Sequence, residues 1–117
     1  MKISLVVLQS PDNGQSSLRA LKFANTALQQ GHEIPRVFFY GDGTLNGHCN
    51  SPLAALWQEA AANSKTELIL CSTSAEKRGV LPQKGNESGT LAPGFEPSGL
   101  GQLLDASLQS DRLITFG

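Results

Sequence analysis

Residues 67–71 read Glu-Leu-Ile-Leu-Cys and run directly into Ser-Thr-Ser-Ala-Glu-Lys-Arg-Gly at residues 72–79, and this stretch decides the fold. Residues 68–70 are a short apolar run, which is typical of a buried strand. Residues 74–78 are predicted as a short helix, and Gly79 stands where a helix-ending glycine belongs, because glycine adopts a left-handed conformation without a Cβ penalty. A strand that leads into a helix is the repeating unit of α/β sheets.

The same alternation extends in both directions along the chain. The predicted strands cover residues 2–8, 36–40, 67–70 and 113–116, with a further short strand around Phe95. The predicted helices cover residues 16–30, 52–62, 74–78 and 98–108, and residues 41–50 and 82–98 are expected to be loops. The strands are apolar throughout rather than alternating, which is typical of a parallel sheet covered on both faces. The sequence therefore predicts an α/β fold, a single three-layer α/β/α domain over residues 1–117 with a mostly parallel central sheet.

Composition excludes some classes of function. Nine Lys and Arg residues stand against ten Asp and Glu residues, and this balance argues against a nucleic-acid-binding protein, which usually has a basic excess. Only 16% of the residues are charged, against about 25% in an average soluble domain. Part of the surface is therefore uncharged. This fits either an oligomer interface, whose core is depleted in charge, or a surface solvated by small polar residues.

The amino terminus and the cysteines indicate the compartment. Residues 1–8 carry one positive charge and an apolar run that is too short for a secretory signal. No stretch approaches the roughly 20 apolar residues of a membrane span. Cys49 and Cys71 form neither a Cys-x-x-Cys pair nor a zinc-binding spacing. We therefore expect a cytoplasmic protein whose thiols are reduced.

Cys71 is the strongest candidate for chemistry. It follows a predicted parallel strand, and ligands in such sheets collect at the carboxyl ends of the strands. A helix is predicted shortly after it. The unpaired N–H groups at the helix start, together with Lys77 and Arg78 if these side chains fold back, would favour the thiolate, which is the nucleophilic form. From spacing alone, the commoner interpretation is a buried cysteine that acts as a small hydrophobic residue.

The remaining candidates are weaker. Cys49 lies beside His48 in a loop, and because adjacent residues seldom point at one another, a simple loop thiol is favoured over a protease or metal site. A disulfide between Cys49 and Cys71 would require this loop to fold over Cys71. The glycines at 41, 43 and 47 match no phosphate-binding motif. Residues 98–101 read Ser-Gly-Leu-Gly at a predicted helix start, where glycines more often have a capping or packing role than bind an anion.

The chain nevertheless resembles a known family. The resemblance runs from the first strand to the last residue, and it is specific through the combination of its parts. It covers residues 22–24, 27–28, 31–33, 37–40, Cys71, residues 78–80, 98–101, 106–107 and 111–112. In these positions the sequence is similar to the TusD group of the DsrE/DsrF-like family. The loop at residues 41–52 is shorter than in that group.

This resemblance implies a DsrE-like fold and a function. The family's active cysteine maps onto Cys71, which implies a sulfurtransferase that acts through a cysteine persulfide, without a metal or an organic cofactor. Ser98, Gly99 and Gly101 would line its pocket. TusD-type chains assemble with TusB-like and TusC-like subunits into a heterohexamer. They take sulfur from a TusA-like donor and pass it to a TusE-like acceptor during 2-thiouridine synthesis at the tRNA wobble position, with no direct contact to nucleic acid or membrane.

Three alternatives stand beside this interpretation. DsrE-type chains do comparable carrier work in sulfur oxidation. Some subunits of such complexes have an idle thiol and a structural role, and the alkylation rate of Cys71 would separate these from carriers. A flavodoxin-like nucleotide or anion binder is the third class, and a ligand screen by thermal shift would test it.

Overall fold

A five-stranded, entirely parallel sheet forms the centre of the protein. The computed structural model describes residues 1–12, 15–81 and 90–117. The strands are β1 (Ile3–Val7), β2 (Arg36–Phe39), β3 (Glu67–Cys71), β4 (Phe95–Ser98) and β5 (Arg112–Phe116). Their order across the sheet is β4-β3-β2-β1-β5. The predicted α/β fold with a parallel sheet is confirmed, and every strand pair is parallel.

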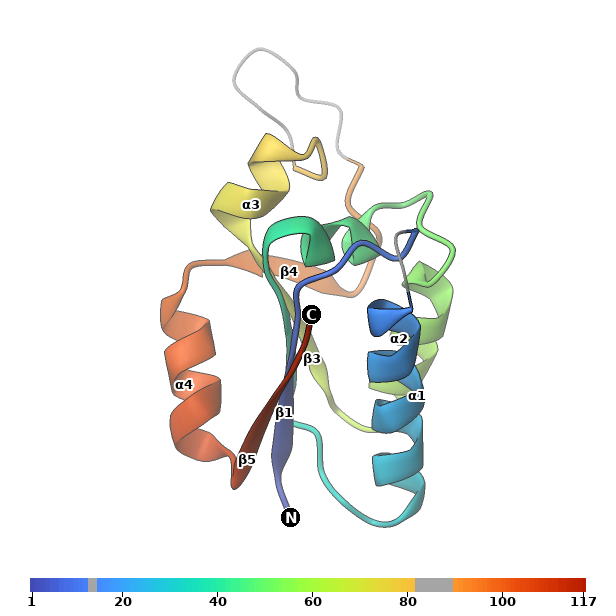
Figure 1. The fold of residues 1–117 in the computed structure, drawn as a ribbon, viewed down its shortest axis with the longest axis vertical. Helices are drawn as coiled ribbons and strands as arrows, with labels where there is room; N and C mark the ends of the chain where they lie inside the picture. Colours follow the sequence, from blue (N-terminus) through green and yellow to red (C-terminus); the bar gives the residue numbers. More distant parts are fainter. Residues whose placement is uncertain (13–14, 82–89) are drawn as a thin grey trace.

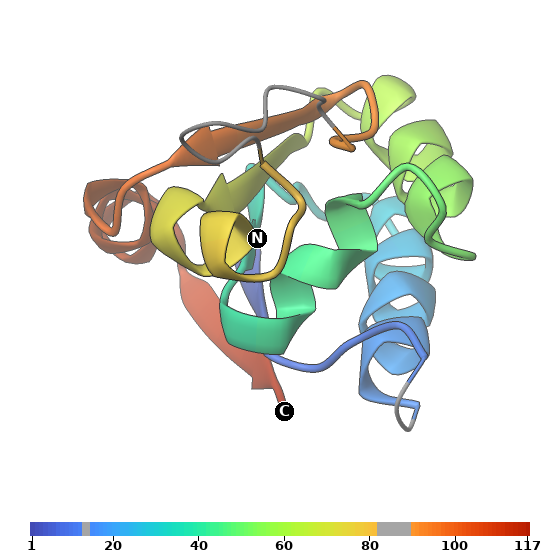
Figure 2. The ribbon, with the colours of Figure 1, turned by 90° about the horizontal axis from the view of Figure 1, so that it is seen from above.

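Helices cover both faces of this sheet. The helices are α1 (Ser16–Gln29), α2 (Ala54–Ala62), α3 (Ser72–Lys77) and α4 (Gly101–Gln109), with a 3-10 helix, η1, at Gly41–Gly47. Figure 1 shows α1 and α2 on one face of the sheet and α4 on the other, which gives the three predicted layers. The short helices α3 and η1 lie side by side above the carboxyl ends of the strands (Figure 2). No helix of the described ranges is long and apolar enough to cross a membrane.

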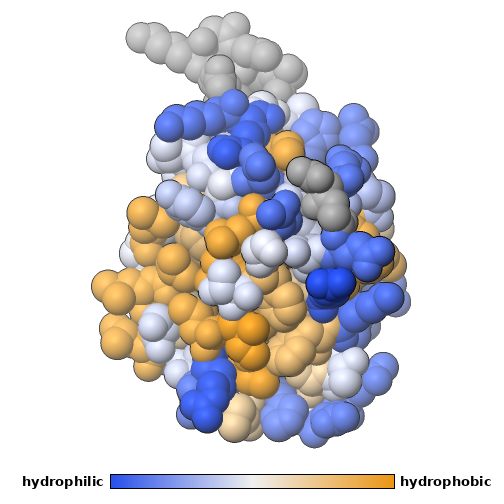
Figure 3. Space-filling view, in the orientation of Figure 1, coloured by the Kyte–Doolittle hydropathy of each residue, from blue (hydrophilic) through white to orange (hydrophobic). Residues whose placement is uncertain are grey.

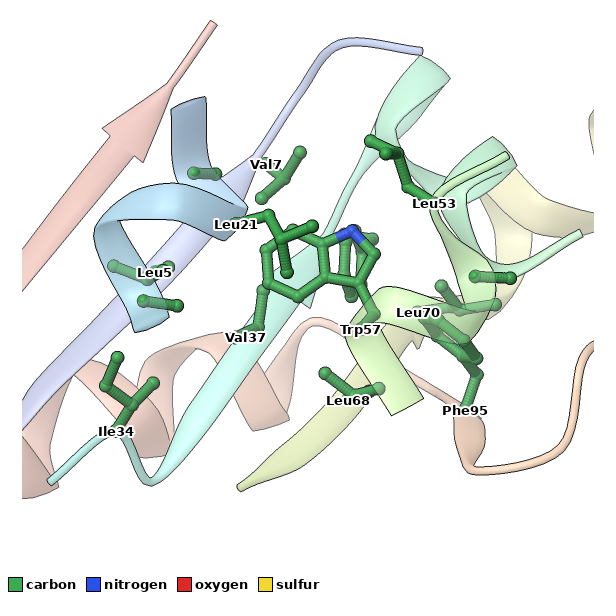
Figure 4. Close-up of a cluster of buried hydrophobic side chains, with 14 of the residues drawn as sticks. Leu5, Val7, Leu21, Ile34, Val37, Leu53, Trp57, Leu68, Leu70 and Phe95 are labelled. Carbon is green, nitrogen blue, oxygen red and sulfur yellow. The ribbon is translucent and has the colours of Figure 1, made fainter. Parts of the chain in front are cut away.

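Two apolar clusters lie on opposite faces of the sheet because successive strand residues point to opposite sides. The larger cluster lies between the sheet and the helices α1 and α2, and Trp57 stands at its centre (Figure 4). The ring of Phe39 meets Trp57 edge to face, with 5.3 Å between the ring centroids. The smaller cluster contains Phe38, Ile69 and Cys71, with Leu103 of α4 packed against it. The side chain of Cys71 therefore belongs to the α4 face.

The structure corrects the sequence prediction in the loops and at the helix starts. Residues 41–47 form η1 instead of a polar loop, and four residues of this helix are buried. The last helix begins at Gly101 rather than at Ser98, because Ser98 pairs with Cys71 as the last residue of β4. Of the predicted loop at 82–98, residues 82–89 lie outside the described ranges, and residues 95–98 form the expected short strand.

The helices α2 and α3 also start at other residues than predicted. Helix α2 begins at Ala54 rather than at residue 52, and Ser51 accepts a hydrogen bond from the N–H of Leu53 just before it. Helix α3 begins at Ser72, two residues earlier than predicted. Its first residue therefore follows Cys71 directly, which places the thiol between the end of a strand and the first turn of a helix.

Candidate functional site

Cys71 is the last residue of β3 and is 4% exposed. Its neighbour across the sheet is Ser98, which ends β4. The strand continues into α3 without an intervening loop, so the backbone direction of the strand fixes the position of the thiol. The residue is thus held by two strands and one helix, and its position depends little on loop conformation.

A pocket of about 370 Å³ opens beside Cys71. Its walls come from four segments that meet at the carboxyl ends of the strands: the end of β2, the end of β3, helix α3, and the turn between β4 and α4. The lining residues are Tyr40, Gly41, Cys71, Thr73, Ser74, Lys77, Arg78, Gly99 and Leu100. The pocket therefore lies where parallel α/β sheets commonly bind ligands.

Two cationic residues line this pocket: Lys77, the last residue of α3, and Arg78, which follows it. Lys77, Arg78 and Cys71 all line this pocket, so the two cationic residues and the thiol border the same space. Arg78 Nε donates a hydrogen bond to Asp42 Oδ1 at 2.8 Å, and its Nη1 donates to the carbonyl oxygen of Ser74 at 3.2 Å. The guanidinium group is thus fixed between η1 and α3. A fixed cation near the thiol can stabilise negative charge on sulfur.

The other predicted candidates divide between the pocket and more distant positions. Gly99 lines the pocket, whereas Ser98 and Gly101 are not among its lining residues. Cys49 is exposed, lies outside the lining, and donates its backbone N–H to the carbonyl oxygen of Thr90. Both thiols are free, so the structure contains no disulfide between Cys49 and Cys71.

The glycines of η1 have a packing role. A Cβ atom on Gly43 would lie 1.9 Å from the carbonyl oxygen of Val7, so only glycine lets the backbone of η1 approach the end of β1 this closely. A Cβ atom on Gly47 would lie 3.0 Å from a methyl carbon of Leu70. This close approach explains the glycines without a phosphate ligand.

Sequence reasoning did not name Tyr40, Asp42, Thr73 or Ser74 as site residues, and it considered Gly41 only as part of a phosphate-binding loop. Tyr40 and Gly41 follow β2, which lies next to β3, so the rule that ligands collect at strand ends would have indicated them. Asp42 carries no such signal, because its contact with Arg78 joins residues that are 36 positions apart. From the sequence, Leu100 was interpreted only as part of a predicted helix start and not as a residue of the pocket.

Two further observations concern other kinds of site. Within the described ranges, no group of three or more His, Cys, Asp or Glu side chains could hold a metal ion. A larger hollow of about 550 Å³ lies between α2 and the residues that lead into β4. Its lining residues contain no ionisable side chain and no thiol.

Comparison with known proteins shows the family and supports the fold. The DsrE protein of Allochromatium vinosum is 36% identical over an alignment of 129 positions, gaps included, which covers 100% of this chain and 99% of that protein. The "Sulfurtransferase TusD homolog" of Pseudomonas aeruginosa is 36% identical and aligns over 96% of this chain and 95% of its own length. The crystal structure of the YchN protein from E. coli superposes with a TM-score of 0.82 at 22% identity, covering 99% of both chains, which shows a shared fold.

The family assignment rests on the whole chain. Residues 1–116 match the DsrE/DsrF-like family, and this match includes every strand and helix of the sheet and the pocket beside Cys71. The full-length relatives at 36% identity agree with it. The chain is therefore a member of the DsrE/DsrF-like family.

Proposed function

We propose that this chain is a sulfur carrier that holds sulfur as a persulfide on Cys71. Its relatives of full length carry the name sulfurtransferase and support a sulfur-transfer role. The observation that carries the assignment to Cys71 is its position in the lining of a pocket that also contains two cationic residues. Cys71 is the one thiol of the chain that lines this pocket, since Cys49 is exposed and lies outside the lining.

The proposed reaction is thiol exchange in two steps. The Cys71 thiolate attacks the outer sulfur of a donor persulfide, the S–S bond of the donor breaks, and the donor leaves as a thiolate. Cys71 then carries the persulfide. An acceptor thiolate attacks this outer sulfur, and Cys71 is released again as a thiolate. No oxidant, metal or organic cofactor takes part, because each S–S bond that breaks is replaced by another.

The geometry supplies three aids to these steps. The strand end and the first turn of α3 hold the sulfur in place, which reduces the entropy cost of the attack. Lys77 and Arg78 add positive potential where thiolate or persulfide charge develops. Burial of Cys71 keeps water and adventitious oxidants away from the persulfide. Because Cys71 is buried, the donor sulfur must enter the pocket, so access to the pocket contributes to the selection of the sulfur donor.

We infer that the chain works inside a larger assembly with TusB-like and TusC-like subunits, between a TusA-like donor and a TusE-like acceptor. Support comes from an exposed apolar surface. Leu100, Leu104 and Leu108 follow each other at four-residue spacing along α4 and are 54%, 64% and 78% exposed. Figure 3 shows an apolar area over this part of the molecule. Large exposed apolar patches on soluble proteins commonly mark interaction sites.

The pathway that we propose is the synthesis of 2-thiouridine at the tRNA wobble position, in the cytoplasm, as for TusD-type chains. Support comes from the match to the TusD homologue. The alternative is a sulfur-oxidation carrier of the DsrE type, which the equally similar DsrE protein favours. Nucleoside analysis separates them: loss of the gene should remove 2-thiouridine from tRNA in the first case and leave it unchanged in the second.

Intact-mass spectrometry after incubation with glutathione persulfide tests the carrier role. The wild type and Cys49→Ser should each gain about 32 Da, the mass of one sulfur atom, on Cys71. Cys71→Ser should gain no sulfur at residue 71. Peptide mapping locates the sulfur, because the exposed Cys49 is the second possible acceptor. A gain confined to Cys49 would overturn the assignment. The absence of any gain, in the presence and absence of the partner subunits, would favour a structural subunit.

A further inference from the structure

The charged side chains that line the Cys71 pocket are all positive. The lining contains Lys77 and Arg78 and no carboxylate, although Asp and Glu outnumber Lys and Arg by ten to nine in the whole chain. Within the described residues Lys77 has no ion-pair partner, and Arg78 is paired with Asp42, which is not among the lining residues. The pocket therefore presents an excess of positive charge to whatever enters.

Arg78 is held in place by two contacts on one side of its guanidinium group. Nε bonds to Asp42 Oδ1 at 2.8 Å and Nη1 bonds to the Ser74 carbonyl oxygen at 3.2 Å. Nη2 lies 4.0 Å from the point that a Cβ atom on Gly41 would occupy, and Gly41 is itself a lining residue. A guanidinium group has five N–H donors, and the two contacts use two of them. The other three donors take part in neither contact, and Nη2, which carries two of them, lies on the side of Gly41.

We propose that Asp42 is a positioning residue that orients Arg78, and that Arg78, with Lys77, makes this pocket select anionic sulfur compounds. This inference deepens the proposed function and rests on Cys71 as the reacting thiol. The ligand class is a persulfide-type sulfur donor that carries negative charge, such as a persulfide whose leaving group bears a carboxylate, and that leaves as a thiolate after its outer sulfur has been transferred. When the Cys71 Sγ–S bond forms and the donor S–S bond breaks, the electron pair leaves with the donor sulfur, and Arg78 and Lys77 lie where that charge arises.

The two functions of Asp42 oppose one another, and this makes the inference testable. As a charge, the carboxylate lowers the positive potential of the pocket. As a hydrogen-bond acceptor, it keeps the guanidinium group on the pocket wall. Arg78 and Asp42 have side-chain exposures of 30% and 61%, so without Asp42 the guanidinium group keeps only its contact with the Ser74 carbonyl oxygen and can turn further toward solvent. If position matters more than net charge, removal of Asp42 should weaken anion selection although the net charge becomes more positive.

The experiment measures the alkylation of Cys71 by two reagents of similar size, iodoacetate with a negative charge and iodoacetamide without one. All variants carry Cys49→Ser, so that Cys71 is the single thiol. The ratio of the two rate constants cancels changes in thiolate fraction and in general access. Arg78→Gln should lower the iodoacetate-to-iodoacetamide ratio by about twofold to fivefold, the range expected for a partly exposed charge pair. Arg112→Gln, an exposed arginine outside the pocket, is the control and should leave the ratio unchanged.

Asp42 variants separate position from charge. Asp42→Ala should lower the ratio, because it removes the anchor of Arg78. Asp42→Asn keeps an oxygen acceptor without the charge, and should keep the ratio at or above that of the parent. The effect of Arg78→Gln should shrink in 1 M salt, where the Debye length is about 3 Å. Thermal unfolding of each variant verifies that the fold is intact. If Arg78→Gln fails to fold, Arg78→Lys, which retains the charge but not the guanidinium group, replaces it in the comparison.

Three outcomes would overturn the inference. The first is a ratio that Arg78→Gln does not change. The second is a ratio that rises in Asp42→Ala, since net charge alone would then decide. The third is a Cys71 that neither reagent modifies, because the pocket would then admit no small ligand. The alkylation ratio is measured without a sulfur donor, so it can succeed even if the mass-gain experiment shows that Cys71 carries no sulfur, and the two proposals fail separately.

Discussion

Trp57 donates its indole N–H to the side-chain oxygen of Asn46 at 3.2 Å, and both side chains are buried. The amide nitrogen of Asn46 donates in turn to the carbonyl oxygens of Gly43 and Gln9 and to the hydroxyl of Ser17. One side chain thus joins η1 to α2, to α1 and to the segment after β1. Because η1 also contains Gly41 and Asp42, this network determines where one wall of the Cys71 pocket lies.

Replacement of Asn46 should destabilise the protein. Asn46→Ala leaves the Trp57 N–H without its acceptor inside the core, and an unsatisfied buried polar group costs about 1–3 kcal/mol. Urea unfolding followed by the fluorescence of Trp57, the single tryptophan, measures the change. Asn25→Ala, at an exposed position of α1, is the matched control and should change the free energy of unfolding by less than about 0.5 kcal/mol. Equal stability of both variants would contradict the importance of the network.

Gly43 should tolerate no side chain. A Cβ atom there would lie 1.9 Å from the carbonyl oxygen of Val7, so Gly43→Ala must push η1 away from the end of β1. We expect a loss of about 1–3 kcal/mol, as for overpacked positions, measured by the same urea titration. Gly101→Ala is the control, because its Cβ would meet nothing within 4 Å and alanine is a better helix former in α4. The prediction is wrong if Gly43→Ala unfolds at the same urea concentration as Gly101→Ala.

The sheet and the position of Cys71 at its carboxyl edge were predictable because their signals are local. Apolar runs identify the strands, and the residue after a parallel strand lies at the edge where ligands bind. The 3-10 helix was not predictable from the same evidence. Its Gly, Asp, Thr and Asn residues are typical of loops, and what holds them in a helix is the long-range contact of Asn46 with Trp57. The ion pair of Asp42 with Arg78 was not predictable either, because it joins residues that are 36 positions apart.

The short strand β4 illustrates a partial success. Its sequence, Phe-Glu-Pro-Ser, contains a proline, which cannot donate a ladder hydrogen bond. The strand exists because it lies at the edge of the sheet and pairs with β3 alone. Phe95 supplied the sequence signal, since its side chain is buried in the core and its ring lies 5.6 Å from that of Phe39. The pairing of Ser98 with Cys71 then moved the start of the last helix to Gly101.

Asp105→Asn should loosen the attachment of α4 in a salt-dependent way. Arg36 contacts both Asp105 of α4 and Glu67 of β3. The hydrogen bond that Arg36 donates to Asp105 is the main cause that raises the pKa of Arg36 above its ordinary value. The guanidinium group therefore stays charged, and its stabilising effect is present, at every pH below that ordinary value. Because Asp105 is 42% exposed, we expect a loss of only about 0.2–1 kcal/mol.

Urea titrations at low and high salt check this expectation. The stability difference between the wild type and Asp105→Asn should become small in 1 M salt, where the Debye length is about 3 Å. Asp111→Asn is less suitable as a control, because Asp111 accepts a hydrogen bond from the N–H of Lys2. Glu59→Gln, at an exposed position on α2, is the better choice. A loss that is independent of salt would mean that packing, rather than charge, holds α4 at this point.

A charge in the middle of the exposed leucine row should prevent assembly without affecting the fold. Leu104 is 64% exposed at the centre of the row that Leu100 and Leu108 complete, and burial of an unpaired carboxylate in an interface is costly. We expect that Leu104→Glu, produced together with TusB-like and TusC-like subunits, elutes as a free chain in size-exclusion chromatography, whereas the wild type elutes with its partners. Leu56→Glu is the matched control, because Leu56 is 45% exposed but lies on α2, on the opposite face of the sheet. If Leu104→Glu elutes with its partners as the wild type does, the partners bind elsewhere. If only Leu56→Glu fails to elute with them, the α2 face is the interface.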